Sequence, residues 1–341
     1  MMSYLPPLPQ VGLGQKKNVR KKPPLVVLAV VLDRAGPDLS PSASDSPMIV
    51  LDGKPITRLV IDGIDSQVTL EKKSDHWVIP AINDFSADQD KVAELINKLK
   101  SIKRNLPVST SAASRERFRV ADDGFERRIQ IFVDDSLAAE IFLGTAPRSR
   151  MIHVRQREDT AVFETQMGLH HASATTQEWL DKALLQVAYP DIRAISVPGL
   201  FRVEKDPNAK VDKAADSADQ PKTVLDSWVS ADPLGENERI EQSSMLVLGQ
   251  KIANIRFKDV LGTTIQSDYG LSTPKLVLQV ETSAGQTLIY ELGLLQGTDD
   301  YVLKISNRPE YFALADYAGK GLLDAADRSM IFLPKLKPIS N

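Results

Sequence analysis

The chain has 341 residues, which is long for one domain of ordinary size and sufficient for two. Hydrophobic residues make up 42% and charged residues 26%, a mixture typical of soluble proteins with a buried core. The 42 Lys and Arg against 45 Asp and Glu give a net charge of −3, which excludes the strongly basic balance of many nucleic-acid-binding proteins. The absence of cysteine excludes disulfides, thiolate metal sites and a cysteine nucleophile.

Residues 1–53 differ in character from the rest of the chain. The basic cluster Lys16–Lys22 precedes the apolar run Leu25–Leu32, in the order of an export signal or membrane anchor. A run of this length spans only about 12 Å as a helix, whereas a bilayer crossing needs roughly 20 residues. Two interpretations stay open: a shortened or mis-started export signal, and a buried strand or disordered arm. Residues 35–55, rich in Pro, Ser, Asp and Gly, predict a linker.

An internal repeat runs through the remaining sequence. Residue types match at positions whose numbers differ by 149, namely Ile129 and Leu278, Ile131 and Val280, Leu143 and Leu292, and Phe163 and Phe312. One constant offset keeps several strands and a glycine turn in register without a gap, which is typical of a duplication. Upstream elements match at a different offset, and Trp77 and Trp228 each lie at the end of a short predicted strand. We therefore interpret residues 54–187 and 188–334 as two similar units.

Each unit contains one predicted amphipathic helix. In the first unit, residues 90–103 place apolar side chains at helical spacing, namely at Val92, Leu95, Ile96, Leu99 and Ile102. Ser86 with Gln89 predicts a capping box at the start of this helix. The corresponding helix of the second unit is predicted over residues 240–254.

A short helix is predicted to close each unit. Thr175 and Glu178 form the pattern of a second capping box, ahead of residues 179–185. The matching segment of the second unit is 322–326.

The elements of each unit are predicted in the order of three strands, a helix, a loop, four strands and a short helix. Apolar and polar residues alternate in the later strands, and Asp134–Ser136 and Ser283–Gln286 suit hairpin turns. The fold class is therefore α+β, with two tandem similar units, each an antiparallel β-sheet with one amphipathic helix and a short closing helix. Residues 206–222 are polar and without periodicity, and predict a mobile loop after the second strand of unit two.

The four histidines do not form a convincing reactive group. His153 and Arg155 share one face of a predicted strand, and His170 and His171 are adjacent in a predicted loop. A zinc site needs a third ligand directed at the same point, and a catalytic histidine needs a nucleophile or carboxylate partner. We therefore expect surface or partly packed histidines, including His76.

Other polar groups also favour structural roles. The acid pairs Asp122-Asp123, Asp134-Asp135 and Asp299-Asp300 fall at predicted turns, where Asp caps backbone amides. Nine arginines of the first unit are interleaved with acids, which favours a mixed-charge surface over an anion-binding face. Trp77, Trp179 and Trp228 lie at apolar positions, which favours core packing over ligand stacking. We therefore predict no catalytic, cofactor-binding or metal-binding residue, and no enzymatic activity.

The strand pattern resembles a known family. In the first unit the resemblance is carried by Ile56–Ile61, Val68–Glu71, His76–Val78, the helix over 90–103, Leu143-Gly144 and Ile152–Arg155. In the second unit it is carried by Asp268–Leu271, Tyr301–Lys304 and Arg308–Phe312. Together these segments are similar to the family of unknown function DUF4340 over roughly residues 54–330. The resemblance rests on strand pattern and supplies no catalytic residues.

The resemblance implies a location and a partner. Members of the family usually have one N-terminal membrane helix and an extracytoplasmic body, and occur beside ABC-type permeases and auxiliary subunits resembling those of gliding motility. The short run Leu25–Leu32 departs from that pattern. We expect a non-enzymatic accessory or scaffold protein in the periplasm, at the inner membrane, with an ABC-type permease or auxiliary membrane subunit as its partner. The alternative is a periplasmic solute- or glycan-binding module with its ligand between the two units.

Overall fold

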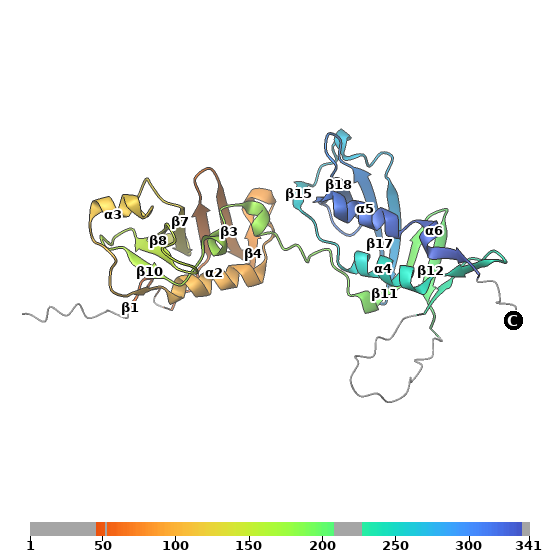
Figure 1. The fold of residues 1–341 in the computed structure, drawn as a ribbon, viewed down its shortest axis with the longest axis horizontal. Coiled ribbons are helices and arrows are strands. Elements are labelled where there is room, and N and C mark those ends of the chain that lie inside the picture. Colours follow the sequence, from red (N-terminus) through yellow and green to blue (C-terminus); the bar gives the residue numbers. More distant parts are fainter. Residues whose placement is uncertain (1–45, 52, 208–226, 336–341) are drawn as a thin grey trace, which may run out of the picture. The chain divides into compact units, whose positions relative to one another are not determined.

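The computed structural model describes residues 46–51, 53–207 and 227–335 (Figure 1). It is an α+β fold with antiparallel sheets, as predicted. The apolar run Leu25–Leu32 and most of the predicted loop 206–222 lie outside the described residues. Among the helices of the described ranges, none is long and apolar enough to cross a membrane.

The first large sheet has eight strands in the order β10-β9-β8-β7-β2-β3-β4-β5, with antiparallel neighbours. Its strands are β2 (Arg58–Asp62), β3 (Gln67–Lys73), β4 (His76–Ile79), β5 (Phe85–Ser86), β7 (Arg127–Val133), β8 (Ser136–Leu143), β9 (Ile152–Gln156) and β10 (Phe163–Thr165). The other elements of this half are β1 (Ser46–Pro47), β6 (Lys103–Arg104), α2 (Gln89–Ser101), α3 (Ala112–Arg117) and the 3-10 turns η1 (Pro80–Ile82), η2 (Leu169–Ala172) and η3 (Thr176–Glu178).

Helix α2 and the strands build the core of the first half (Figure 1). Ile129 and Ile131 of β7 are fully buried, and so are Leu95 and Leu99 of α2, as the two periodicities predict. The predicted linker ends earlier than expected, because Ser46–Pro47 pairs with β6 and Met48 is only 1% exposed. An apolar side chain at that point gains more from burial than a solvated linker would allow.

The second large sheet has eight strands in the order β13-β12-β11-β16-β17-β18-β19-β15, again with antiparallel neighbours. Its strands are β11 (Ile192–Val197), β12 (Phe201–Lys205), β13 (Trp228–Ser230), β15 (Asp259–Gly262), β16 (Leu276–Thr282), β17 (Thr287–Leu294), β18 (Tyr301–Ile305) and β19 (Tyr311–Leu314). The other elements are β14 (Glu238–Ile240), β20 (Phe332–Pro334), α4 (Gln242–Ala253), α5 (Asp316–Ala325), α6 (Arg328–Ile331) and the 3-10 turns η4 (Tyr189–Asp191) and η5 (Ser267–Tyr269).

Seven strands follow the same path in both sheets. The order β10-β9-β8-β7-β2-β3-β4 of the first sheet corresponds to β19-β18-β17-β16-β11-β12-β13 of the second. Cross-strand pairs also correspond: Ile129 faces Ile141 and Leu278 faces Tyr290, both at the offset of 149. The sheets differ in the eighth strand, because β5 extends the first sheet beside β4 whereas β15 extends the second beside β19.

Three predicted helix features are wrong in detail. Asp88, rather than Ser86, caps α2, and its side chain accepts a hydrogen bond from Lys91 N at 3.1 Å. Thr175 forms no side-chain cap, and only Thr176–Glu178 is helical. Residues 179–185 do not form the predicted helix, because their first residues pair with the chain just before α2 as a strand would. Asp88 N donates to Trp179 O, and Asp181 N donates to Ser86 O.

The closing helix of the second half is longer than predicted. It begins at Asp316 and ends at Ala325, rather than covering 322–326. Gly319 and Gly321 lower the helix propensity of residues 316–321, so the sequence does not indicate the first turns of this helix. The fold needs Gly319, because a Cβ there would lie 2.2 Å from the ring of Tyr301.

Candidate functional site

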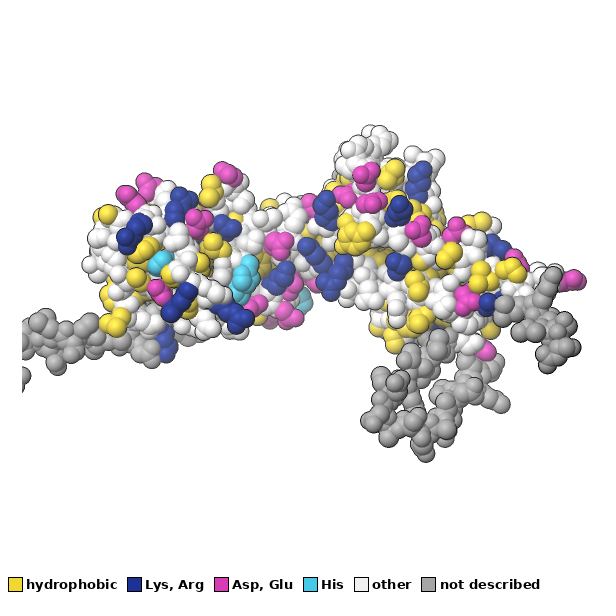
Figure 2. All heavy atoms as spheres, in the orientation of Figure 1, with side chains coloured by type: hydrophobic (Ala, Val, Ile, Leu, Met, Phe, Trp, Pro, Cys, Tyr) yellow, Lys and Arg dark blue, Asp and Glu magenta, His cyan; other side chains and the backbone are white. Residues whose placement is uncertain are grey.

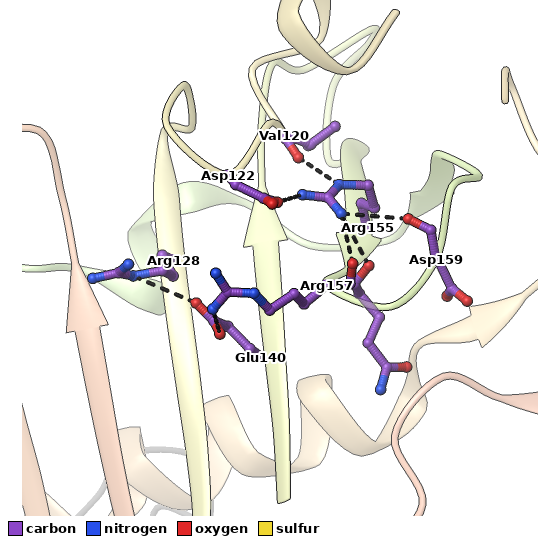
Figure 3. Close-up of polar contacts among 8 residues, drawn as sticks. Val120, Asp122, Arg128, Glu140, Arg155, Arg157 and Asp159 are labelled. Carbon is purple, nitrogen blue, oxygen red and sulfur yellow. Dashed lines mark hydrogen bonds and ion pairs between the residues drawn. The ribbon is translucent and has the colours of Figure 1, made fainter. Parts of the chain in front are cut away.

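A row of charged side chains crosses the first sheet, and Figure 3 shows three of its members, Arg128, Glu140 and Arg157. We call Asp62, Arg128, Glu140 and Arg157 the charged row. Arg128 Nε lies 2.8 Å from Asp62 Oδ2 and 3.7 Å from Glu140 Oε1, and Arg157 forms an ion pair with Glu140. Glu140 is 1% exposed and Asp62 6%, so two carboxylates are buried beside two half-exposed guanidinium groups.

The charged row is a matched set of opposite charges. The hydrogen bond that Arg157 donates to the Glu140 carboxylate raises the pKa of Arg157 above its usual value. Gln67 Nε2 donates to the second oxygen of Asp62 at 2.5 Å. Among the described residues, Glu140 Oε1 has no hydrogen-bond partner. Pairing of this kind adds little net stability, because the cost of removing the charges from water offsets their mutual attraction.

Arg155 lies beside the charged row and is almost completely buried, at 1% exposure. Its Nε donates to Val120 O at 2.7 Å, and its Nη1 donates to Arg157 O at 2.9 Å and Asp159 O at 3.3 Å. Its Nη2 pairs with Asp122 (Figure 3). The guanidinium therefore donates its hydrogen bonds to backbone carbonyls and to one carboxylate. The prediction that the arginines lie on a mixed-charge surface is wrong for Arg155, which is buried.

Lys304 occupies the corresponding place in the second sheet. Its Nζ donates to Arg308 O, just as Arg155 donates to Asp159 O, and both pairs of residue numbers differ by 149. Burial lowers the pKa of Lys304 below its usual value. In both sheets a basic side chain thus donates a hydrogen bond to a backbone carbonyl in the turn after its own strand, Arg155 to Asp159 O after β9 and Lys304 to Arg308 O after β18.

His153 is buried and packed against neighbouring side chains. It is 4% exposed, its ring stacks on Phe118 at 4.1 Å, and its Nδ1 donates to Thr145 O at 2.8 Å. The expectation of a packed histidine is confirmed here, but its burial is greater than expected.

The adjacent histidines lie against helix α2. The rings of His170 and His171 are 3.9 Å apart, and His171 Nε2 lies 3.3 Å from Glu94 Oε1. They line a hollow of about 200 Å³ together with Lys91 and Glu178. No group of three or more His, Asp or Glu side chains that could hold a metal ion occurs in the described part of the chain.

The remaining sequence candidates also have structural surroundings. Trp77, Trp179 and Trp228 are 7%, 2% and 2% exposed, so core packing is confirmed. Asp134 has a φ of 52° in the turn between β7 and β8. Asp300 pairs with Lys258 at 2.7 Å and accepts a hydrogen bond from Asp316 N, as expected of an acid that caps a backbone amide.

A glutamine clamp is a feature that the sequence analysis missed. Gln89, the first residue of α2, accepts from Trp77 N through Oε1 and donates to Trp77 O through Nε2, both at 2.9 Å. Gln242, the first residue of α4, makes the same two bonds to Trp228 at 2.7 and 2.9 Å. The available signal was a glutamine 12 or 14 residues after a tryptophan, at the start of each helix.

A second shared feature is a backbone segment that crosses a glycine at the end of a strand, Gly144 just after β8 and Gly293 near the end of β17. A Cβ at Gly144 would lie 2.0 Å from Phe118 O, and one at Gly293 would lie 2.2 Å from Tyr269 O. Each crossing segment contains a residue in the left-handed region, Arg119 with φ 58° and Gly270 with φ 66°. Only glycine lets the two backbones approach this closely.

These features define an α+β protein of antiparallel sheets, in which Arg155, Lys304 and the two clamp glutamines bind the chain's own backbone. A family model described as "Domain of unknown function (DUF4340)" matches residues 77–274. The chain belongs to this family, as the strand pattern predicted. No curated protein and no solved structure matches the chain.

Proposed function

We propose that this protein is a non-enzymatic accessory or scaffold protein of the cell envelope, which binds an ABC-type permease or an auxiliary membrane subunit on the extracytoplasmic side of the inner membrane. The observation that carries the proposal is the use of the polar groups. The guanidinium of Arg155, the ammonium of Lys304 and the amides of Gln89 and Gln242 all bind the chain's own backbone.

The proposal includes a tandem duplication. Its support is the shared order of seven strands, the pairs at an offset of 149, the glutamine clamp and the glycine crossing. Features that recur in both halves are those that one ancestral module needed in order to fold. The charged row does not recur: Glu140 corresponds to Ile289, and Arg128 corresponds to Val277.

Chemistry by the charged row is disfavoured by its pairing. General acid–base catalysis needs a group that can take or give a proton at a substrate. Glu140 is 1% exposed and lies between two guanidinium groups, so a substrate would have to displace an ion pair to reach it. Such a carboxylate is better suited to holding β7, β8 and β9 together.

The proposed location and partner come from the family resemblance. They are tested by affinity purification of the full chain from detergent-solubilised membranes of its own host, followed by mass spectrometry. A permease or auxiliary subunit of an ABC-type transporter is expected in the eluate, in excess over a mock purification. Recovery of neither class of membrane protein would contradict the proposal.

A further inference from the structure

The second half carries an open groove between α4 and α5. Its volume is about 450 Å³, and Val247, Tyr317 and Leu322 form part of its apolar lining. Val247 is 47% exposed and Tyr317 81%. Figure 2 shows hydrophobic side chains and basic side chains close together in this region. Contiguous exposed apolar surface of this kind marks interaction sites.

The apolar surface continues beyond the groove. Val247 also lines an adjoining hollow of about 160 Å³ with Ala325 and Met330, and Met330 is 55% exposed. The linings of the two hollows have Val247 in common, so exposed apolar side chains of α4, α5 and α6 lie on both sides of this residue. Apolar surface spread along a helix in this way suits an elongated occupant rather than a compact small molecule.

Comparison of the two helices isolates what is special about α4. The clamp residues Gln89 and Gln242 are the first residues of α2 and α4. Five residues further along each helix, α2 has Glu94 and α4 has Val247, so these two residues occupy equivalent positions. Glu94 is 57% exposed and charged, as is usual for the solvent face of an amphipathic helix. The second half instead exposes valine at that position.

The charge of the groove is one-sided. Lys251 and Arg256 line it, and its lining contains no Asp or Glu. Within the described residues, neither cation has an ion pair. Lys251 reaches across to α5, because a Cβ at Gly321 would lie 2.8 Å from Lys251 Nζ. An apolar floor with cations at its side complements an apolar stripe with acidic flanks.

We propose that the α4–α5 groove binds an acidic amphipathic helix of a partner protein. This inference rests on the proposed accessory function and deepens it, because it states the chemistry of the partner segment. An anionic membrane surface fits less well, since a flat surface cannot enter a concave groove to reach Leu322, which is 2% exposed.

The test uses three labelled 18-residue peptides and the full chain. The first peptide has leucines at i, i+3, i+4 and i+7 with glutamate flanks, the second has lysine flanks, and the third is a scramble of the first. Fluorescence anisotropy is expected to show binding of the acidic helix at least ten-fold tighter than of the other two. Val247→Glu and Lys251→Glu are each expected to weaken that binding at least ten-fold.

A matched control lies in the first half. Leu137 is an exposed apolar residue on β8, 49% accessible, so Leu137→Glu adds the same charge to a different surface and is expected to leave binding unchanged. Circular dichroism of each variant verifies its folding. Equal binding of the acidic and basic peptides, or insensitivity to both groove substitutions, would overturn the proposal.

Two further outcomes would assign the groove to another occupant and overturn the inference. One is self-association in sedimentation velocity that Val247→Glu abolishes, which points to a second copy of the chain. The other is Val247-dependent binding to vesicles of anionic phospholipid. If the peptides fail while a permease still co-purifies, only the groove assignment falls. If they bind while no membrane partner co-purifies, only the proposed function falls.

Discussion

The glutamine clamp gives the sharpest stability prediction, because the same two bonds to a tryptophan backbone occur in both halves with different neighbouring contacts. Gln89 Nε2 also donates to Ala87 O at 2.6 Å, and that carbonyl accepts a second hydrogen bond from Ser86 Oγ. Gln89→Ala removes the bonds to Trp77, but Trp77 O keeps the hydrogen bond from Ala87 N at 2.9 Å. Gln242→Ala removes the amide from both Trp228 N and Trp228 O. The second substitution is therefore expected to be the more damaging.

The magnitudes follow from the groups that lose a partner. An unsatisfied buried backbone group costs about 1–3 kcal/mol. One such group at Trp77 gives a loss of about 2 kcal/mol, and two groups at Trp228, which is 2% exposed, give about 3–4 kcal/mol. With roughly 2–4 °C per kcal/mol for domains of 150–250 residues, Gln242→Ala lowers the Tm by roughly 6–16 °C.

Urea and thermal unfolding, followed by circular dichroism, measure these changes. Gln250→Ala, at an exposed position of α4, is the matched control and is expected to change the free energy of unfolding by less than about 0.5 kcal/mol. Gln89→Glu keeps the acceptor for Trp77 N and loses the donor, so it is expected to fall between wild type and Gln89→Ala. Clamp variants as stable as the control would refute the reasoning.

Three other substitutions test separate contacts. Tyr290→Phe is expected to stabilise the protein by about 1 kcal/mol, because the Tyr290 hydroxyl is buried and has no hydrogen-bond partner in the described structure. Burial raises the pKa of Tyr290 to about 12. The stability that depends on the neutral hydroxyl is therefore present below about pH 10 and is lost as the pH rises toward 12. In thermal melts at alkaline pH, Tyr290→Phe is expected to lose less stability than the wild type. Gly144→Ala is expected to cost about 3 kcal/mol or more in urea unfolding, because its Cβ would meet a carbonyl at 2.0 Å, whereas Gly124→Ala, whose nearest contact would be 3.8 Å away, stays near wild type. Arg155→Met is expected to cost about 3 kcal/mol or more by the same measurement, because the carbonyls of Val120, Arg157 and Asp159 lose the buried guanidinium that donates to them. Arg150→Met at an exposed position is expected to change little.

The spacing of apolar residues and the internal repeat predicted the matching strands of the two sheets and helix α2, because these features depend on local sequence patterns. The constant offset gave the matching pairs Leu143–Val154 and Leu292–Leu303, because strand register follows the alternation of buried residues. Helix α2 was visible because its apolar residues recur at helical spacing with polar residues between them.

The features that sequence reasoning missed depend on contacts between distant segments. Ser86 and Gln89 have capping-box spacing, but the Gln89 amide is taken by Trp77, so Asp88 caps the helix instead. Arg155 could not be recognised as buried, because its acceptors come from Val120, Asp122 and the β9–β10 turn, and their convergence exists only in the fold. No local pattern encodes such a convergence.

We propose that the second half contacts a membrane partner through the α4 surface that carries Val247, at the helix position where α2 carries Glu94. Photocrosslinking in intact host cells tests it, with a photoreactive amino acid placed at position 247 and, as the control, at position 94. We expect a crosslink from position 247 to an acidic helix of a permease or auxiliary subunit, and none from position 94. Equal crosslinking from both positions, or from neither, would contradict it.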